Sequence, residues 1–264
     1  MGGRQRGGNT SAKDFYSFDP GTNTWTAIAD FPADHAGNPG ISGAQSFALY
    51  GAGYVTIGVR TNGVVNKDLY RYDPAQNEWQ QKASFTGDLS LGSVSWANHN
   101  FGYIAFGGVL EVKGGVYRYD PLKDAWESMK SMGAVKDGLA FNYDNNGIRV
   151  TGDASSSMFS SNYVSDTDIY NPSENDWFGW PKMNFSGPGR SSATGFKIGN
   201  ELFLGGGYRD GSYESDFWKY APADAILPEA AYHLKATPLS DVQCKLTWNH
   251  KGDSATGLIL LIKD

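Results

Sequence analysis

Polar side chains that follow short apolar runs are the first candidates for chemistry in this sequence. Arg60 and Asn62 follow one such run, Asp153 follows another, and Tyr208 and Arg209 follow a third. Arginine, amide and carboxylate groups at such positions are suited to hydrogen bonding with a polar or anionic ligand. We predict that these five residues bind a ligand; the alternative is that the arginines are simply exposed surface residues.

Two further features extend this prediction. Arg4 follows the pair Gly2-Gly3 much as Arg60 and Arg209 follow their own glycines, so repetition would arrange the three arginines around one face as an anion-binding ring. The serine-rich segment from Ser155 to Asn162 is either a glycan-facing surface or a flexible polar loop.

Residues with the spacing of a metal site or a nucleophilic centre are not found. Cys244 is the single cysteine, so an intrachain disulfide and a multi-cysteine zinc site are both excluded. The sequence has no Gly-x-Ser-x-Gly, phosphate-loop or His-Glu-x-x-His motif. The histidines are scattered: His35, His99, His233 and His250. We therefore predict no catalytic residue, no metal and no cofactor.

Composition excludes other classes of function. The net charge is −6 and no dense lysine or arginine run is present, so nucleic acid is not an expected partner. No apolar run approaches the roughly 20 residues of a membrane-spanning helix. No apolar segment that could serve as a signal peptide follows Met1 to Arg4. The chain contains 34 Gly, 15 Tyr, 14 Phe and 8 Trp, a mixture that favours short strands joined by tight turns.

An internal repeat positions these side chains. An aromatic residue followed by an Asx-Pro pair recurs with a period of about 50 residues. The copies are Phe18-Asp19-Pro20, Tyr72-Asp73-Pro74, Tyr119-Asp120-Pro121, Tyr170-Asn171-Pro172 and a degenerate Tyr220-Ala221-Pro222. A tryptophan follows the first four prolines, at Trp25, Trp79, Trp126 and Trp177. This spacing predicts a β-hairpin in each copy.

Another pair of strands precedes each complete hairpin, and its second strand is apolar and ends in glycine, as at Gly107-Gly108 and Gly205-Gly206. We expect these glycines to allow close backbone approach. We expect the marked tyrosines (Tyr72, Tyr119 and Tyr170) and the tryptophans to fill the space between neighbouring sheets. Four strands in each period of about 50 residues are typical of a propeller blade.

With its glycine doublet, third-strand tyrosine and fourth-strand tryptophan, the repeat resembles the kelch motif, in particular that of secreted Bacteroidetes-type proteins. The resemblance implies an all-β kelch propeller of four-stranded antiparallel blades over residues 1–222, with about five blades visible. The predicted blades are 1–39 (partial), 40–86, 87–133, 134–186 and 187–222 (partial). Because the first and last lack strands, we expect an amino-terminal truncation of a ring of at least five blades, with six as our best estimate.

The pattern changes after Pro222. Residues 223–228 are predicted to be a linker, and 229–264 a partial β-sandwich segment. Tyr232 to Ala236, Lys245 to Trp248 and Gly257 to Ile262 are the expected strands. Their order resembles the opening of a fibronectin type III domain, which needs about 100 residues.

These resemblances imply a non-catalytic binding or scaffolding propeller of a larger extracellular or cell-surface bacterial protein, with a protein or glycan ligand. One alternative is a carbohydrate-active kelch enzyme, mutarotase-like or galactose-oxidase-like, whose site is incomplete in this sequence. A purely architectural spacer and an intracellular kelch adaptor are further alternatives. The sequence makes no prediction of ligand identity or oligomeric state.

Overall fold

The computed structural model describes the chain except for residues 1–9, 35, 109–110, 144, 156–159, 180–184, 200, 221–231, 241–242, 251–252 and 261–264. Every helix or strand element within the described residues is a β-strand. The chain divides into two compact units, Met1–Pro222 and Ala223–Asp264.

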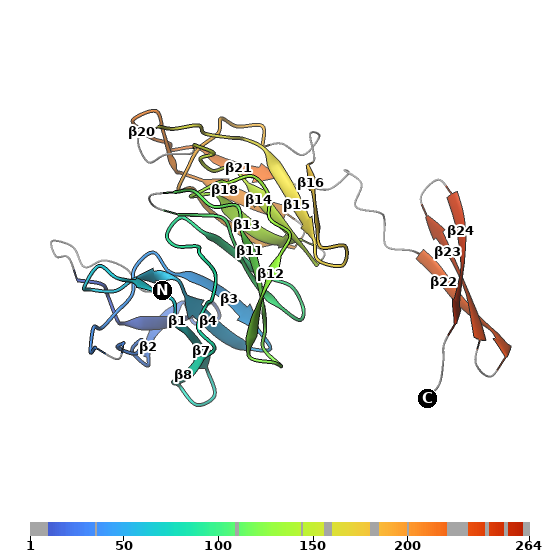
Figure 1. The fold of residues 1–264 in the computed structure, drawn as a ribbon, viewed down its shortest axis with the longest axis horizontal. Coiled ribbons are helices and arrows are strands. Elements are labelled where there is room, and N and C mark those ends of the chain that lie inside the picture. The colour runs from blue at the N-terminus through green and yellow to red at the C-terminus, as the bar shows by residue number, and fades with distance from the viewer. Residues whose placement is uncertain are drawn as a thin grey trace. The chain divides into compact units, whose positions relative to one another are not determined.

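Three antiparallel four-stranded sheets follow one another along the first unit and form blades two, three and four of a propeller (Figure 1). The strands of each blade lie side by side in sequence order. Blade two consists of β3 (Gln45–Leu49), β4 (Ala52–Thr56), β7 (Leu69–Asp73) and β8 (Glu78–Lys82). Blade three consists of β9 (Val94–Ala97), β10 (Gly102–Ala105), β11 (Val116–Asp120) and β12 (Ala125–Met129). Blade four consists of β13 (Leu139–Tyr143), β14 (Asn146–Val150), β15 (Thr167–Asn171) and β16 (Asp176–Gly179).

Blade five shows three strands in the described residues: β17 (Thr194–Ile198), β18 (Glu201–Gly205) and β21 (Phe217–Tyr220). A two-stranded hairpin of β1 (Phe15–Asp19) and β2 (Thr24–Ile28) precedes blade two. The strands β3, β9, β13 and β17 contact one another in that order, which places them innermost in the propeller. The predicted all-β propeller is confirmed.

Aromatic side chains fill the space between neighbouring blades. Phe47 and Tyr54 of blade two stack with their ring centroids 5.2 Å apart, and Tyr54 lies 5.7 Å from the ring of Tyr119 in blade three. Such pairs contribute about 0.5–1.5 kcal/mol each beyond the area that they bury. The same arrangement joins blades three and four through Trp96, Tyr103 and Tyr170.

A set of hydrogen bonds, here called the clasp, joins the hairpins of blades two, three and four to the residue that follows the preceding hairpin. Nε1 of Trp79 donates to the carbonyl of Ala29 at 2.9 Å, and the Ala29 N–H donates to Oδ1 of Asn77 at 2.8 Å. The Tyr72 hydroxyl donates to the same Oδ1 at 2.8 Å. Asn77 has a φ of 51°, a region that asparagine and aspartate tolerate well. The clasp recurs at Tyr119, Asp124, Trp126 and Ala83, and again at Tyr170, Asn175, Trp177 and Lys130.

The first hairpin differs from these three. Trp25 is 69% exposed, and its ring packs on Phe18 at a centroid distance of 4.9 Å. Phe18 stands where the other hairpins have tyrosine and has no hydroxyl to donate. Within the described residues, Trp25 therefore makes no clasp.

The first marked glycine pair lies where two backbone segments come close, and the second lies beside an aromatic side chain. A Cβ on Gly108, whose φ is 128°, would lie 2.0 Å from the carbonyl oxygen of Glu111. Gly107 also has a positive φ, of 93°. In the second pair, Gly205 ends β18 and Gly206 has a φ of 63°. A larger residue would clash with backbone atoms at Gly107 and Gly108 and with the Phe217 ring at Gly205, and it would be strained by the positive φ at Gly206.

The second unit contains one antiparallel sheet of β22 (Tyr232–Ser240), β23 (Gln243–His250) and β24 (Asp253–Leu260), paired in that order. The predicted linker 223–228 lies outside the described residues. A search of the described part of the chain finds no helix with the length and apolar character needed to cross a membrane.

Candidate functional site

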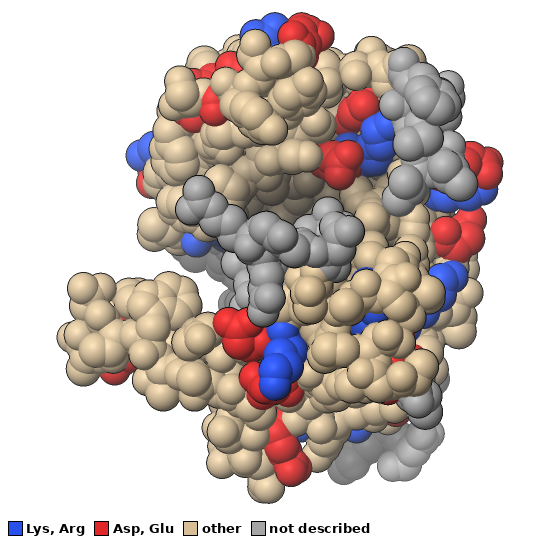
Figure 2. Space-filling model, turned by 90° about the vertical axis from the view of Figure 1, so that its left-hand side faces the viewer, with Lys and Arg blue, Asp and Glu red and all other residues tan. Residues whose placement is uncertain are grey.

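The loops between the second and third strands of each blade lie on one face, together with the connections that lead into the innermost strands. Figure 2 views the side on which β20 lies in Figure 1 and shows a hollow near its centre, with acidic and basic side chains beside it. Isolated β-bridges join the two kinds of loop. These bridges are Ser42 to Val59, Lys136 to Asp153, and Ser191 to Tyr208. We call this surface the loop face.

A small β-ribbon projects from blade five at this face. It pairs β19 (Tyr208–Arg209) with β20 (Ser212–Tyr213). The turn between them has φ values of 49° at Asp210 and 86° at Gly211, typical of a tight hairpin turn. The Tyr213 side chain is 86% exposed, and its ring meets that of Tyr208 edge-on at 5.4 Å. The ribbon therefore presents an aromatic surface on ordered backbone.

Charged groups flank the two tyrosines. Nε of Arg209 donates to Oε1 of Glu214 at 3.0 Å, and its Nη1 lies 3.6 Å from Oδ2 of Asp210. The Arg209 side chain is 38% exposed, so this charge is balanced locally and still accessible. The five residues Tyr208, Arg209, Asp210, Tyr213 and Glu214 are called the ribbon site.

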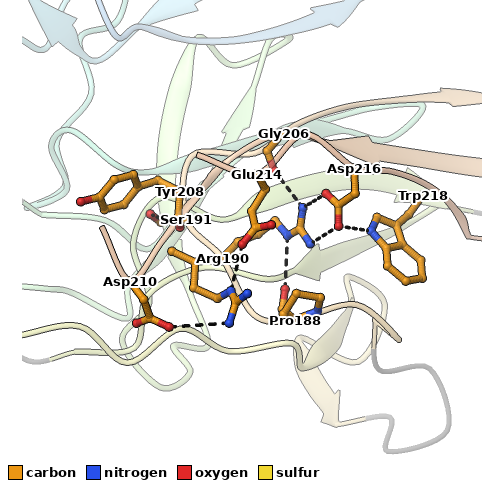
Figure 3. Close-up of polar contacts among 10 residues, drawn as sticks. Pro188, Arg190, Ser191, Gly206, Tyr208, Asp210, Glu214, Asp216 and Trp218 are labelled. Atoms are coloured by element: carbon orange, nitrogen blue, oxygen red, sulfur yellow. Dashed lines mark hydrogen bonds and ion pairs between the residues drawn. The ribbon is translucent and has the colours of Figure 1, made fainter. Parts of the chain in front are cut away.

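A buried arginine lies beside the ribbon, between Gly206, Pro188 and Asp216 (Figure 3). Arg190 is completely buried and forms a two-bonded ion pair with Asp216, in which Nη2 donates to Oδ2 at 2.8 Å. Its Nη1 also donates to the Gly206 carbonyl at 3.0 Å, next to the start of the ribbon. Trp218 donates its Nε1 to Oδ2 of Asp216 at 2.6 Å. The hydrogen bonds from Arg190 lower the pKa of Asp216 to about 2.

Of the residues predicted to bind ligand, Arg60 lies in the interior. Only 2% of its surface is exposed, and its guanidinium lies 5.0 Å above the Phe31 ring. Nη1 donates to the Pro32 carbonyl at 2.6 Å, and Nε donates to Oδ1 of Asn66 at 3.1 Å. The Arg60 guanidinium therefore holds the loop together and is not presented to a ligand at the surface.

Asn62 is exposed near the tip of a second ribbon, formed by β5 (Gly58–Val59) and β6 (Val65–Asn66). Its Oδ1 accepts a hydrogen bond from the Val64 N–H at 3.0 Å, so part of the side chain is used by the turn.

Asp153 is buried, with 5% of its surface exposed. Oδ1 accepts the N–H groups of Ser155 and Asn162, each at 2.9 Å, and Lys136 Nζ lies 3.5 Å from Oδ2. Asp153 thus holds the two ends of the predicted serine-rich insertion together; residues 156–159 of the insertion lie outside the described residues.

The five predicted residues come from three blades, and the structure brings only Tyr208 and Arg209 together. Arg60, Asp153 and Arg209 each make their polar contacts with different neighbours. Of the three arginines predicted to form an anion-binding ring, Arg60 is buried and Arg209 is at the surface, so these two do not form a common surface. Arg4 lies outside the described residues.

Sequence reasoning missed Asp137 at the inner rim of the loop face. Its N–H donates to the Gly92 carbonyl at 2.8 Å, and its own carbonyl accepts the Ser192 N–H at 2.8 Å. Within the described residues, its carboxylate accepts no hydrogen bond. Burial raises the pKa of this carboxyl; Asp153 adds to the effect and Lys136 opposes it.

The sequence feature that could have pointed to Asp137 is its position in the repeat. It lies two residues before an innermost strand and has a φ of 53°, where blades two and three have glycine, at Gly43 and Gly92. Tyr213 was likewise overlooked because an isolated tyrosine carries no motif. Among the described residues, no three His, Cys, Asp or Glu side chains gather as a metal-binding group.

Comparison with known proteins supports the fold and does not identify a function. No protein-family model matches the chain, and no curated protein matches its sequence. Among solved structures, 184 chains match. One is the structure of YjhT, with a TM-score of 0.66 and 17% identity over 85% of this chain and 78% of that chain. This likeness shows a propeller fold, and folds of this kind serve many functions.

Proposed function

We propose that the chain is a non-catalytic binding module, a kelch-type propeller that recognises a protein or glycan partner through its loop face. The observation that carries the proposal is Tyr213, which is 86% exposed on a ribbon anchored by the ion pair of buried Arg190 with partly buried Asp216. An exposed tyrosine on ordered backbone offers contact area at low entropic cost.

The surroundings of Tyr213 are suited to recognition. Tyrosine and arginine are enriched among the residues that dominate binding energy, and polar groups around them supply specificity. The ribbon site combines both: Tyr208 and Tyr213 provide apolar area, while Arg209, Asp210 and Glu214 provide donors and acceptors.

The proposed setting is a larger secreted or cell-surface bacterial protein. The hairpins that repeat tyrosine, Asx and tryptophan support the kelch assignment, because that combination builds each clasp. The three-stranded antiparallel sheet of the second unit supports a fibronectin type III-like segment, a module common in extracellular proteins.

A glycan array and a surface-protein binding screen, run with matched variants, test the function. Tyr213→Ala is expected to weaken binding by at least about tenfold, which corresponds to about 1.4 kcal/mol. Leu122→Ala is the control, because Leu122 is also 86% exposed but lies in an Asx-Pro turn, away from the loop face. Equal binding by wild type and Tyr213→Ala would rule out the ribbon site.

Asp137 favours a second candidate, a carbohydrate-active enzyme of the mutarotase-like class. A carboxyl group with raised pKa at the rim of a propeller face is suited to general acid–base catalysis. Anomer interconversion of reducing sugars, followed by NMR, tests this candidate. Catalysis that Asp137→Asn abolishes would replace the binding proposal, whereas absence of any acceleration would remove the enzymatic one.

A further inference from the structure

A polar depression of about 250 Å³ lies between blades three and four. It is formed where β9, β13 and β15 end, so it lies on the face opposite the loop face. Its described lining residues are Asn98, Asn145, Asn146, Asn171, Pro172 and Ser173, and none of these six is charged. We call it the amide pocket.

Asn171 has a group that the fold does not use. Its Oδ1 accepts the Ser173 N–H at 3.0 Å and so holds the Asx-Pro turn. Three other copies of the turn make the same bond with an aspartate, at Asp19, Asp73 and Asp120. Aspartate has no N–H to donate, so folding requires only the oxygen. The Asn171 NH₂ group makes no hydrogen bond within the described residues.

Asn145 repeats this situation in the neighbouring turn. Its Oδ1 accepts a hydrogen bond from Nδ1 of His99 at 2.8 Å, and the backbone φ of Asn145 is 70°. The corresponding turn of blade two has Gly51 at this place, with a φ of 75°, so the backbone needs no amide side chain here. The Asn145 NH₂ group is also without a hydrogen-bond partner within the described residues.

We propose that the amide pocket binds a neutral sugar unit, with Asn145 and Asn171 donating to its oxygens and the Ser173 hydroxyl accepting from it. Ser173 Oγ already donates to Oδ1 of Asn171 at 2.7 Å, which leaves its lone pairs available. The described lining residues carry no charge that would pair with an ionic ligand, and Pro172 is the one apolar residue among them. Sugar hydroxyls both donate and accept, and a pocket below the usual 300 Å³ or more is suited to a single ring.

Side-chain amide signals give a direct test. The ¹⁵N-labelled chain is titrated with the methyl glycosides of glucose, galactose and mannose to about 50 mM, because a few neutral hydrogen bonds support millimolar affinity. At least one glycoside should shift the NH₂ signals of both Asn145 and Asn171 in a saturable manner. If none of the three does so, the proposal is overturned, whether or not signals of the loop face respond.

A double variant tests the donors. Asn171→Ser keeps an oxygen for the turn and Asn145→Gly copies blade two, so both NH₂ groups are lost while the turns can still form. Binding should weaken at least about tenfold. Asp120→Ser makes the same turn change in blade three and should leave affinity unchanged. Unchanged affinity in a folded double variant contradicts the proposal. Tyr213→Ala should bind the glycoside normally, which separates this site from the ribbon site.

Discussion

Two buried arginines lie over phenylalanine rings beneath the loop face. Arg60 lies 5.0 Å from the centre of the Phe31 ring, and Arg190 lies 5.2 Å from that of Phe185. Both guanidinium groups also donate to backbone carbonyls of the adjacent loop. A guanidinium tolerates such a place because its planar donors match several acceptors while its face stacks on an aromatic ring. These arginines fix loops that would otherwise have unsatisfied carbonyls.

Replacing Arg60 by Met should therefore destabilise the propeller by about 2–4 kcal/mol, because the carbonyls of Pro32 and Gly40 lose their donor. Urea unfolding followed by tryptophan fluorescence measures the change. Arg209→Met, at a partly exposed arginine, should alter stability by less than about 1 kcal/mol. Equal effects of the two variants would show that Arg60 does not hold its loop.

Tryptophans of the same repeat should differ in importance. Trp126→Phe leaves the Ala83 carbonyl without its donor and should reduce stability by about 1–3 kcal/mol. Trp25→Phe removes an exposed indole and should change stability by less than about 0.5 kcal/mol. Chemical denaturation of both variants gives the comparison, and a larger loss for Trp25→Phe would contradict the clasp.

Asp137 should reduce stability at neutral pH. A carboxyl group whose pKa is raised in the folded chain contributes fully below its unfolded pKa, and the contribution is lost as pH rises through the folded value. Asp137→Asn, which also tolerates a positive φ, should raise the Tm by about 1–4 °C at pH 7 and have no such effect at pH 3. Scanning calorimetry at both pH values measures the change in Tm. A lower Tm for Asp137→Asn than for wild type at pH 7 would contradict the prediction.

At the scale of elements, the Arg190–Asp216 ion pair connects β21 to the ribbon. The lowered pKa of Asp216 means that this carboxylate stabilises the folded chain above its unfolded pKa of about 4, and that the contribution is lost as pH falls towards 2. Asp216→Asn should be less stable than wild type by up to about 2 kcal/mol at pH 7. Urea unfolding between pH 7 and pH 2 should show the difference shrinking below pH 4; a constant difference would exclude the ion pair as its cause.

The strands were predictable because their signals are long and repeated. Each hairpin contains an aromatic residue, an Asx-Pro pair and a tryptophan in fixed order, and β7–β8, β11–β12 and β15–β16 follow from it. The ribbon β19–β20 has two residues in each strand, too few for a periodic pattern. Sequence spacing also equated Arg60 with Arg209, although Arg60 shares the surroundings of Arg190. Burial of a long side chain depends on neighbours from other loops, which spacing does not reveal.

At the scale of the molecule, the repeats act as internal controls for function. A residue that the fold requires recurs from blade to blade, as the clasp does at Trp79, Trp126 and Trp177. A residue that departs from its counterparts where the backbone is unchanged has another reason to be there. Asp137 on one face and Asn171 on the other meet this criterion, so both faces of the propeller are candidates for recognition.

The two units should differ in their resistance to proteolysis. The first has aromatic packing between successive blades, whereas the described part of the second is a single three-stranded sheet, which is marginal without further packing. Limited trypsin digestion followed by mass spectrometry should therefore detect cleavage after Lys235 and Lys245 before cleavage after Arg71 and Arg118, which lie in β7 and β11. The Trp126→Phe variant should speed cleavage at the two arginines alone, because it weakens the junction between blades two and three. Equal protection of all four sites would show that the second unit is as stable as the propeller.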